Sequence, residues 1–511
     1  MSVGREHKVR KILLLAALLL AFGCLAGAGA EGSGYHSDFS RDTDGWYARS
    51  MGEASLSLED GALAIAGRAD DWNSPGRDFR LEKGETYALS VRVMQDEADA
   101  ARFMISVAHT RGGVESYENL GSATAKKGEW TTVTGSYTAG DYERFVLYVE
   151  TTGAPELSFR MKDFTLEGRV SEFGGEDIPA LKDVCAGLFD FGTAVTGSEA
   201  LNRQRMAFYA SQFNIMTPGN ELKPDFVLDV NASKAMATED ETAAVVRFDA
   251  VKPLLDFARE NGVKVHGHVL VWHSQTPEVF FHEGYSRFKP LVSREVMLAR
   301  LENYVKGIME YLDENYPGVV VSWDVVNEAI DDGTGKLRAS NWTKVVGDDF
   351  ILRAFEIARK YAPEGTLLYY NDYNTALEPK QTGIVNLLQD LMAEGTVDGY
   401  GFQMHHDVRF PSAAQIKKSV ERIAALGLRL RVSELDVTVG SRSDEAFEKQ
   451  AAYYADVMAI LLPYAEQIEA VQVWGVTDDL SWRASQYPLL FDAAAAPKPA
   501  FWAVVNAVKG E

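Results

Sequence analysis

The sequence predicts a multidomain protein in which an all-β jelly-roll sandwich precedes a (β/α)8 TIM barrel. The chain has 511 residues, more than one ordinary domain holds. Its N-terminal part contains short segments of alternating apolar and polar residues, whereas the rest alternates short apolar segments with amphipathic helical ones. Hydrophobic residues make up 46% and charged residues 24% of the chain, a composition typical of folded globular domains.

The first domain is predicted to span residues 35–169. Its candidate strands are separated by turns containing Gly, Asp or Lys-Gly, which is typical of an antiparallel sandwich. The strand segments are ASLSLEDGALAIAG, TYALSVRVMQ, ARFMISVAHT, WTTVTGSYTA, RFVLYVETT and LSFRMKDFTLEG. A link rich in Gly and acidic residues, at 170–180, separates this domain from the next.

The second domain is predicted to span residues 181–511. Amphipathic segments such as FDAVKPLLDFARENG and DDFILRAFEIARKYAP end at Gly or Pro, as helices do. Eight apolar strand segments alternate with them, which is what a (β/α)8 barrel requires. These strands are FDFGTAV, FNIMTP, KVHGHVLVW, VVVSWDVV, TLLYYND, GYGFQMH, RLRVSEL and AVQVWGV.

Residues 1–30 have the pattern of a secretory signal peptide. Basic residues precede the apolar run ILLLAALLLAF, and small residues follow it. We favour cleavage after Ala30, which releases a secreted extracellular chain. The alternative is a lipoprotein box ending at Cys24, which would anchor the chain at the cell surface through a lipid. No other segment resembles a transmembrane span, so the mature chain is expected to have none.

Charge and cysteine content limit the partners. A formal net charge of -23 repels phosphate backbones, so no nucleic-acid partner is expected, whereas a neutral polymer is compatible with it. Within the folded region Cys185 is the one cysteine, so no intramolecular disulfide is available and each domain must be stabilised by its own core. We expect a monomer.

Two glutamates end predicted strands. Glu328 ends the fourth strand, in VVVSWDVVNEAI, and Glu434 ends the seventh, in RLRVSELDV. Side chains at the carboxyl ends of opposite strands of a closed barrel can converge above it. Two carboxyl groups about 5–5.5 Å apart are the machinery of a retaining glycoside hydrolase, in which one protonates the leaving oxygen and the other attacks the anomeric carbon. The alternative is that each glutamate joins an ion pair at the rim.

The segment from about residue 181 to 509 resembles the glycoside hydrolase family 10 endo-β-1,4-xylanases at every strand end. WDVVNEA matches the family's fourth strand, which implies that Glu328 is the acid/base and that Asn327 binds the 2-hydroxyl of the sugar being cleaved. SELDV matches its seventh strand, which implies that Glu434 is the nucleophile, although Thr is more usual than Ser433. The resemblance implies hydrolysis of internal xylosidic bonds of xylan by double displacement, without a cofactor.

The same resemblance assigns neighbours to the two glutamates. GFQMHH implies that Gln403 and His405 lie beside the nucleophile, and that His405 bridges toward Asp436. A histidine donor there would keep the nucleophile ionised and correctly aimed.

Substrate contacts are implied at three more strand ends. HGHVLVWHSQTP, MTPGNELKPD and WGVTDDLSW match the family's sugar-binding segments, but Gly219 stands where Glu is commonest and Pro224 where Trp is commonest. One hydrogen bond to the second sugar on the non-reducing side is therefore in question. The implied substrate-binding residues are Asn220, Lys223, His268, Trp272, Gln275, Gln403, Trp474 and Trp482. Trp323, by contrast, is predicted to be a core residue.

Three other functions are considered. Clustered histidines at the third and sixth strands resemble a metal site of the amidohydrolase type, but that class places His-x-His on the first strand, where this chain has DFGTAV. A catalytically silent xylan-binding protein is the second alternative. An enzyme that prefers short xylo-oligosaccharides or mixed-linkage glucan is the third, because the altered GNELKP segment contacts the second sugar.

The sandwich resembles a family 22 carbohydrate-binding module in GWYARS, DDWNSPG, SYENL and LYVE. The resemblance implies binding of xylan or other plant cell-wall β-glycans through Arg49, Trp72, Tyr117, Tyr148 and Glu150, with Val146 in place of a frequent aromatic residue. The alternative is that Trp72 and Tyr117 belong to the sandwich core. Such modules often hold a structural calcium ion, for which Asp38, Asp163 or nearby backbone carbonyls are candidate ligands, although the sequence does not show a ligand set.

Overall fold

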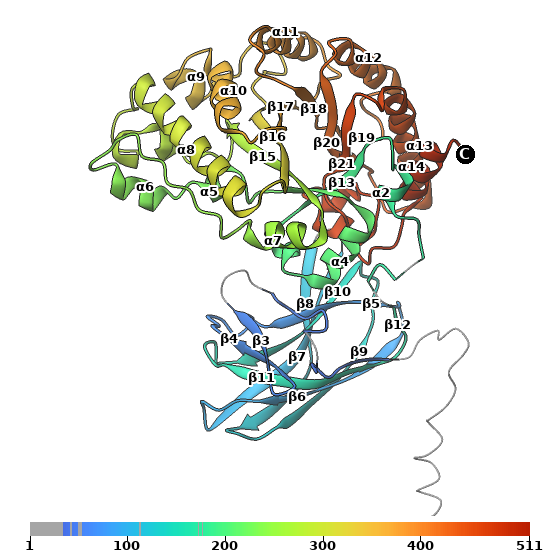
Figure 1. The fold of residues 1–511 in the computed structure, drawn as a ribbon. Coiled ribbons are helices and arrows are strands. Elements are labelled where there is room, and N and C mark those ends of the chain that lie inside the picture. Colours follow the sequence, from blue (N-terminus) through green and yellow to red (C-terminus); the bar gives the residue numbers. More distant parts are fainter. Residues whose placement is uncertain (1–33, 41–42, 50–53, 112–113, 172, 176) are drawn as a thin grey trace, which may run out of the picture.

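A computed structural model describes residues 34–40, 43–49, 54–111, 114–171, 173–175 and 177–511, and it forms a β-sandwich followed by a barrel (Figure 1). The predicted signal segment and both of its alternative endings lie outside the described residues. Among the helices that the described residues form, none combines the length and the apolar character needed to cross a membrane.

The sandwich consists of two antiparallel sheets of six strands each, as the sequence predicts. In β6 the side chains of Tyr87, Leu89, Val91 and Val93 are buried, while the residues between them face outward. This alternation fills the space between the sheets with apolar side chains. The first sheet contains β3 (Ser55–Glu59), β4 (Ala62–Ala66), β11 (Phe159–Glu167), β6 (Thr86–Met94) and β9 (Thr131–Thr138) in that order, with β1 (Tyr35–Ser37) beside β11.

The second sheet contains four strands that the sequence analysis did not identify, of which β5 and β8 are the longest. Its order is β12 (Val170–Ser171), β5 (Pro75–Leu81), β10 (Arg144–Thr152), β7 (Ala100–Arg111) and β8 (Val114–Lys126), with β2 (Tyr47–Ala48) beside β5. β8 is an edge strand with mostly exposed polar residues, and β5 carries buried charged residues, so neither shows an apolar alternation. Pairing of β12 with β5 extends the sheet into the segment predicted to be a link.

The barrel has eight parallel strands that close into a ring, which confirms the predicted fold. Closure comes from pairing of β18 with β20, while the short β19 (His405–Asp407) lies beside the end of β20. The eight strands are β13 (Asp190–Val195), β14 (Ile215–Pro218), β15 (Lys264–Trp272), β16 (Val320–Asn327), β17 (Leu367–Asp372), β18 (Gly399–Phe402), β20 (Arg429–Thr438) and β21 (Ile468–Val473).

The surrounding helices bury one face against these strands. In α10 (Phe350–Tyr361) the residues Phe350, Ile351, Ala354, Phe355 and Ala358 are buried, which is the spacing of one helical stripe. The other helices are α2 (Leu181–Val184), α3 (Gly197–Ala200), α4 (Arg203–Gln212), α5 (Pro224–Val227), α6 (Val230–Met236), α7 (Lys252–Asn261), α8 (Arg294–Asn315), α9 (Asn341–Val345), α11 (Lys380–Ala393), α12 (Ala413–Ala424), α13 (Asp444–Leu461) and α14 (Pro499–Lys509).

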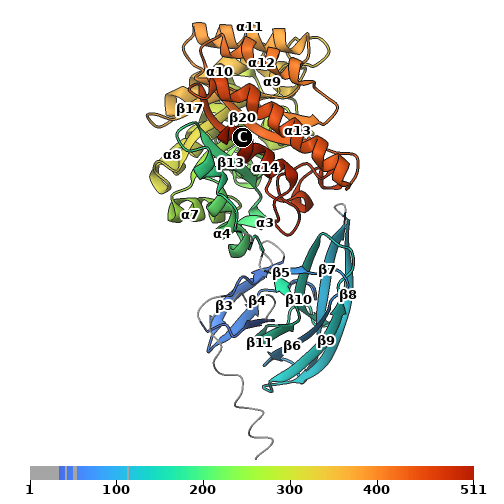
Figure 2. The ribbon, with the colours of Figure 1, turned by 90° about the vertical axis from the view of Figure 1, so that its right-hand side faces the viewer.

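Trp323 in β16 fills the barrel core, as predicted, and is almost fully buried. A Cβ atom at Gly267 in β15 would lie 2.3 Å from the indole ring, so only glycine fits opposite this tryptophan. The two views agree that α4 lies on the side of the barrel facing the sandwich (Figure 2).

Candidate active site

A cleft of about 740 Å³ lies at the carboxyl ends of the barrel strands. Every barrel residue that the sequence analysis nominated lines it except Asp436, which contacts a lining residue from behind. The nominated lining residues are Asn220, Lys223, His268, Trp272, Gln275, Asn327, Glu328, Gln403, His405, Glu434, Trp474 and Trp482. Residues from distant parts of the chain therefore meet in one cavity.

Glu328 follows the last residue of β16 and is held by three donors. Trp272 Nε1 donates to Oε2 at 2.9 Å, and Gln403 Nε2 donates to Oε1 at 2.9 Å. The Asn327 amide also donates to Oε1, at 3.2 Å. The backbone of Glu328 has a φ of 57°, in the left-handed region that L-residues with a side chain seldom adopt. Such strain is typical of functional residues whose orientation the surrounding structure fixes.

Glu434 lies in β20, buried, and His405 supports it. His405 Nε2 lies 3.0 Å from Glu434 Oε2, and its Nδ1 lies 2.8 Å from Asp436 Oδ2. Since both partners are carboxylates, both ring nitrogens donate and the imidazole is positively charged. Burial lowers the pKa of His405, but the charge and hydrogen bond of Asp436 outweigh it and raise the pKa to about 10.

The pKa of Glu434 is lowered in turn. Burial acts to raise this pKa, but the hydrogen bond from His405 and the charges of His268 and His405 outweigh that effect. Glu434 is therefore held as a carboxylate, the form that attacks carbon.

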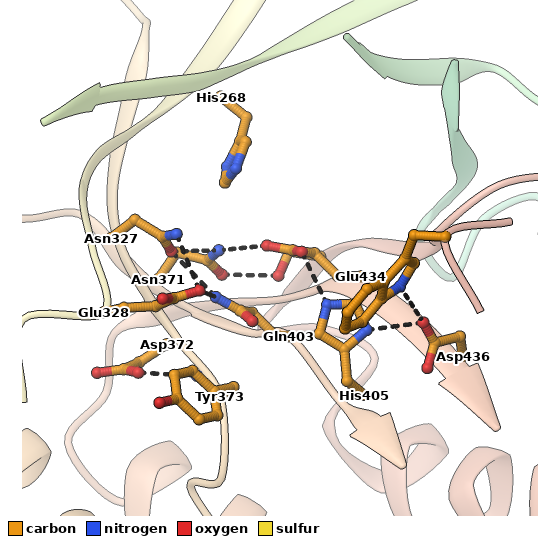
Figure 3. A network of polar contacts seen from close by, with 12 residues as sticks. His268, Asn327, Glu328, Asn371, Asp372, Tyr373, Gln403, His405, Glu434 and Asp436 are labelled. Atoms are coloured by element: carbon orange, nitrogen blue, oxygen red, sulfur yellow. Dashed lines mark hydrogen bonds and ion pairs between the residues drawn. The ribbon is translucent and has the colours of Figure 1, made fainter. Parts of the chain in front are cut away.

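One hydrogen-bond network joins the two glutamates (Figure 3). Asn371 Nδ2 donates to Glu434 Oε1 at 2.8 Å and to Asn327 Oδ1 at 3.0 Å. Gln403 Nε2 donates to the same Asn327 oxygen at 3.1 Å and reaches Glu328 as well. The two carboxylates thus lie at the same end of the barrel, above the carboxyl ends of the strands, in a single network.

The sequence analysis missed Asn371, the second-last residue of β17. A signal was present, because an amide directly follows the apolar run TLLYY just as Asn327 follows VVVSWDVV. Ser433 Oγ donates to Asn371 Oδ1 at 2.6 Å and so fixes the amide's orientation. Ser433, which stands where Thr is more usual, therefore orients an amide that binds Glu434.

Asp436 accepts hydrogen bonds from three side chains. Besides His405, it accepts hydrogen bonds from Trp482 Nε1 at 2.9 Å and from Arg483 Nη1 at 3.0 Å. Trp482 keeps 63% of its surface exposed and lies edge-on to His405, with ring centroids 5.0 Å apart. Its exposed surface faces the cleft that a sugar chain would occupy.

Lys223, Asn220 and Gln275 form a polar cluster on another wall of the cleft. Lys223 Nζ donates to Asn220 Oδ1 and to Gln275 Oε1, each at 2.9 Å. The ammonium group also lies 5.1 Å from the centre of the Trp272 ring. Burial lowers the pKa of Lys223, partly offset by the negative charge of Glu434. These contacts hold the cluster ready to bind sugar hydroxyls.

Gly219 leaves open space beside this cluster. A Cβ atom there would meet only Val195 O at 3.7 Å and Thr196 Cγ2 at 3.8 Å, both ordinary contacts. The space that a glutamate commonly fills in the family that the barrel resembles is therefore part of the cleft.

His268 and His266 share one buried carboxylate. His268 Nδ1 lies 2.9 Å and His266 Nε2 lies 3.1 Å from Asp324 Oδ2. Trp474 packs against His268 with ring centroids 5.5 Å apart. Asp324 thereby orients the imidazole of His268 toward the cleft.

In the sandwich, the nominated binding residues lie on the outer face of the second sheet or at its border. Arg49 Cζ lies 3.7 Å above the Tyr148 ring, and Ser106 Oγ donates to Glu150 at 2.6 Å. Trp72 is 50% and Tyr117 is 62% exposed. The alternative that these two aromatic residues belong to the core is therefore wrong.

The two carboxylates named for calcium have separate partners. Asp38 Oδ1 accepts a hydrogen bond from the Ser40 amide at 2.8 Å, and Asp163 pairs with Arg92 at 3.3 Å. Within the part of the chain that the structure describes, no group of three or more His, Cys, Asp and Glu side chains could hold a metal ion. The structural calcium ion stays a prediction.

The site and the fold match known proteins. Residues 180–507 match the profile of Glycosyl hydrolase family 10, and residues 33–156 match that of a carbohydrate binding domain. Endo-1,4-beta-xylanase A of Thermoanaerobacterium saccharolyticum is 32% identical over 465 residues, which cover 88% of this chain and 39% of the relative. Endo-1,4-beta-xylanase B of Butyrivibrio fibrisolvens is 35% identical over 337 residues, which cover 64% of this chain and 53% of the relative.

A solved structure resembles both domains together. It contains the CBM22-1 and GH10 modules of an endo-1,4-β-D-xylanase from Clostridium thermocellum, complexed with xylohexaose. It is 28% identical, has a TM-score of 0.60, and covers 93% of this chain and 97% of its own. The chain spans about half or less of the length of the two curated relatives above. From the family match across most of the chain and the strand-end site, it follows that this protein belongs to glycosyl hydrolase family 10 and carries a carbohydrate-binding domain before its barrel.

Proposed function

We propose that this protein is a retaining endo-β-1,4-xylanase that hydrolyses internal bonds of xylan by double displacement. The observation that carries the proposal is the single network that holds Glu328 and Glu434 in one cleft. The names of the family 10 relatives from Thermoanaerobacterium saccharolyticum and Butyrivibrio fibrisolvens support the choice of xylan.

In the first step Glu434 attacks the anomeric carbon and forms an ester with the sugar. Its lowered pKa keeps it ionised for this attack. Glu328 gives its proton to the leaving glycosidic oxygen, so the bond to the second half of the chain breaks without releasing an alkoxide. The carbonyl of Asn327 accepts from both Asn371 and Gln403, which turns the Asn327 amide group toward the reacting sugar and Glu328.

In the second step water replaces the ester. Glu328, now a carboxylate, removes a proton from the water that attacks the anomeric carbon, and Glu434 leaves as a carboxylate. Two displacements at the same carbon retain its configuration. His405 stabilises the carboxylate of Glu434 both before attack and as it departs.

The module is proposed to hold the chain on plant cell-wall polysaccharide. Its exposed Trp72 and Tyr117, with Glu150 and the Arg49–Tyr148 pair, supply the stacking surfaces and charged groups that sugars contact. Secretion, or attachment through Cys24, is proposed because an insoluble cell-wall polymer lies outside the cell. We also propose that the protein acts as a monomer.

The nucleophile assignment is tested with Glu434→Ala. Turnover of xylan should fall by several orders of magnitude because the covalent step is lost. Added azide should restore cleavage of an aryl xyloside and give the product of inverted configuration, since azide takes the vacant place of the carboxylate. Wild-type release of oligosaccharides from xylan but not from cellulose supports the substrate, and an inert wild-type enzyme on xylan contradicts the proposal.

A further inference from the structure

Four charged side chains form a buried cluster between the two domains. Asp78 and Arg144 come from the sandwich, and Arg205 and Asp479 come from the barrel. Asp78 Oδ1 lies 2.7 Å from Arg144 Nε and 3.0 Å from Arg205 Nη2. Asp479 Oδ2 lies 3.4 Å and 3.6 Å from the same two guanidinium groups. We call these four residues the interdomain charge cluster.

The cluster is shielded from water. The exposed fractions of its side chains are 16% for Arg144, 4% for Asp78, 1% for Arg205 and 0% for Asp479. Phe173, from the segment joining the domains, covers Arg205, whose Cζ lies 4.5 Å from the ring centre. Buried charges are costly unless all of them are paired, so removal of one partner leaves the others uncompensated.

The sandwich core does not need these charges. Asp78 lies in β5 and Arg144 at the start of β10, on the face opposite the one that packs between the two sheets, where Phe79 and Phe145 lie. Asp78 is buried because α4 covers it, and Asn202 before that helix donates to Asp78 Oδ2 at 2.9 Å. The placement of Asp78 and Arg144 therefore serves the contact with the barrel.

On the barrel side the cluster reaches a segment of the active site. Residues 477–483, which we call the Trp482 loop, follow β21. Arg205 Nη1 donates to Thr477 Oγ1 at 3.1 Å and its Nη2 pairs with Asp479 in the same loop. Leu480 and Trp482 of this loop line the cleft, and Trp482 and Arg483 both donate to Asp436. A continuous set of contacts therefore runs from Asp78 to the support of the nucleophile.

We propose that Asp78 and Arg144 of the carbohydrate-binding domain are positioning residues of the active site. They fix the Trp482 loop through Arg205 and Asp479, and the loop fixes Asp436 and His405 behind Glu434. The sandwich thus contributes to hydrolysis of a soluble substrate that it does not bind.

A purely structural role would make a different prediction. If the cluster only joined the domains, loss of Asp78 would lower stability and leave the cleft unchanged, or would lower activity whether or not Trp482 is present. Position in a chain of contacts is not by itself proof of coupling, so a double-mutant cycle is the appropriate test.

The cycle compares the full-length enzyme with Asp78→Asn, Trp482→Ala and the double variant on a soluble aryl xylobioside. Asp78→Asn should lower kcat/KM by about tenfold, within the range for residues that share one network. In the Trp482→Ala background the same change should have a smaller effect, because one of the loop's two donors to Asp436 is already lost. Asp141→Asn is the matched control, since Asp141 forms exposed pairs with Lys83 and Arg111 on the same domain.

Hydrogen exchange gives a readout independent of activity. Peptides covering residues 477–487 should exchange faster in Asp78→Asn than in the wild type and the control. Equal effects of Asp78→Asn in both backgrounds, or unchanged kinetics and exchange in a folded variant, would overturn the inference. If Asp78→Asn does not fold, Arg144→Gln replaces it in the same cycle. The double-mutant cycle rests on the proposed hydrolase activity, so an inactive wild-type enzyme would refute that activity. The hydrogen exchange measurement would still test the coupling between Asp78 and the Trp482 loop.

Discussion

Replacement of His405 by glutamine should shift the acidic limb of the pH profile. The nucleophile reacts as a carboxylate, so kcat/KM falls as the pH drops through the pKa of Glu434 in the free enzyme. In the wild type that pKa is lowered, because the hydrogen bond from His405 and the charges of His268 and His405 outweigh the effect of burial. Activity therefore persists below the pH at which an ordinary buried glutamate would be protonated.

The size of the shift follows from the lost contact. A hydrogen bond to a charged group contributes about 1.5–3 kcal/mol, and one pKa unit corresponds to about 1.4 kcal/mol. Glu434 is buried, so solvent does not screen this contact. In His405→Gln the limb should therefore move up by about one to two pH units. The sign is fixed, because removal of a positive neighbour makes protonation of the carboxylate easier.

The assay is kcat/KM against pH with an aryl xylobioside that has a good leaving group. Such a substrate needs little help from the acid, so the limb reports the nucleophile alone. His406→Gln is the matched control, since His406 contacts Tyr453 and not Glu434. A limb that stays in place in His405→Gln, or moves equally in His406→Gln, refutes the reasoning.

Three further variants test other parts of the molecule. Glu328→Ala should lower kcat on xylan by about 10²–10⁴-fold, yet largely spare aryl glycosides whose leaving group needs no proton. Trp72→Ala should reduce retention on insoluble xylan roughly fivefold to tenfold, with soluble turnover unchanged. Gly219→Glu fits the open space beside Thr196 and should lower KM for xylo-oligosaccharides by about twofold to tenfold, the effect of one new hydrogen bond.

For each of these three variants, one result would contradict the prediction. Equal losses on xylan and on activated aryl glycosides in Glu328→Ala would argue against its role as an acid. Trp130→Ala serves as the control for Trp72, because Trp130 lies against Arg92 and Lys162 of the first sheet. Equal retention of the two variants would place the sugar elsewhere on the module. An unchanged KM in a stable Gly219→Glu variant would mean that the second sugar on the non-reducing side does not reach the part of the cleft beside Gly219.

The barrel and its two glutamates were predictable because their signals are local. Each strand contains a short apolar run, and Asn327, Glu328 and Glu434 lie at or near the carboxyl end of one, so position along the chain indicates position in the barrel. The same signal marks Asn371, which was overlooked because an amide alone does not specify a reaction. Its role becomes visible only when Glu434 and Asn327 are seen on either side of it.

The parts that sequence reasoning missed depend on distant contacts. β5 contains Pro75, Gly76 and three charged residues, and these are compatible with a strand because β10 and the barrel cover them. Asp78 and Arg205 lie 127 positions apart, and nothing in either segment indicates its partner. Such pairings are set by tertiary packing, which no local pattern reports.

The left-handed backbone of Glu328 has a consequence for the improvement of this enzyme. A residue with a side chain costs about 1–2 kcal/mol in that conformation, a cost that glycine avoids. Heat tolerance and turnover therefore make opposite demands on this position. A library screened only for survival at high temperature would enrich glycine here and yield robust but inert proteins, so stabilisation campaigns should keep this codon constant.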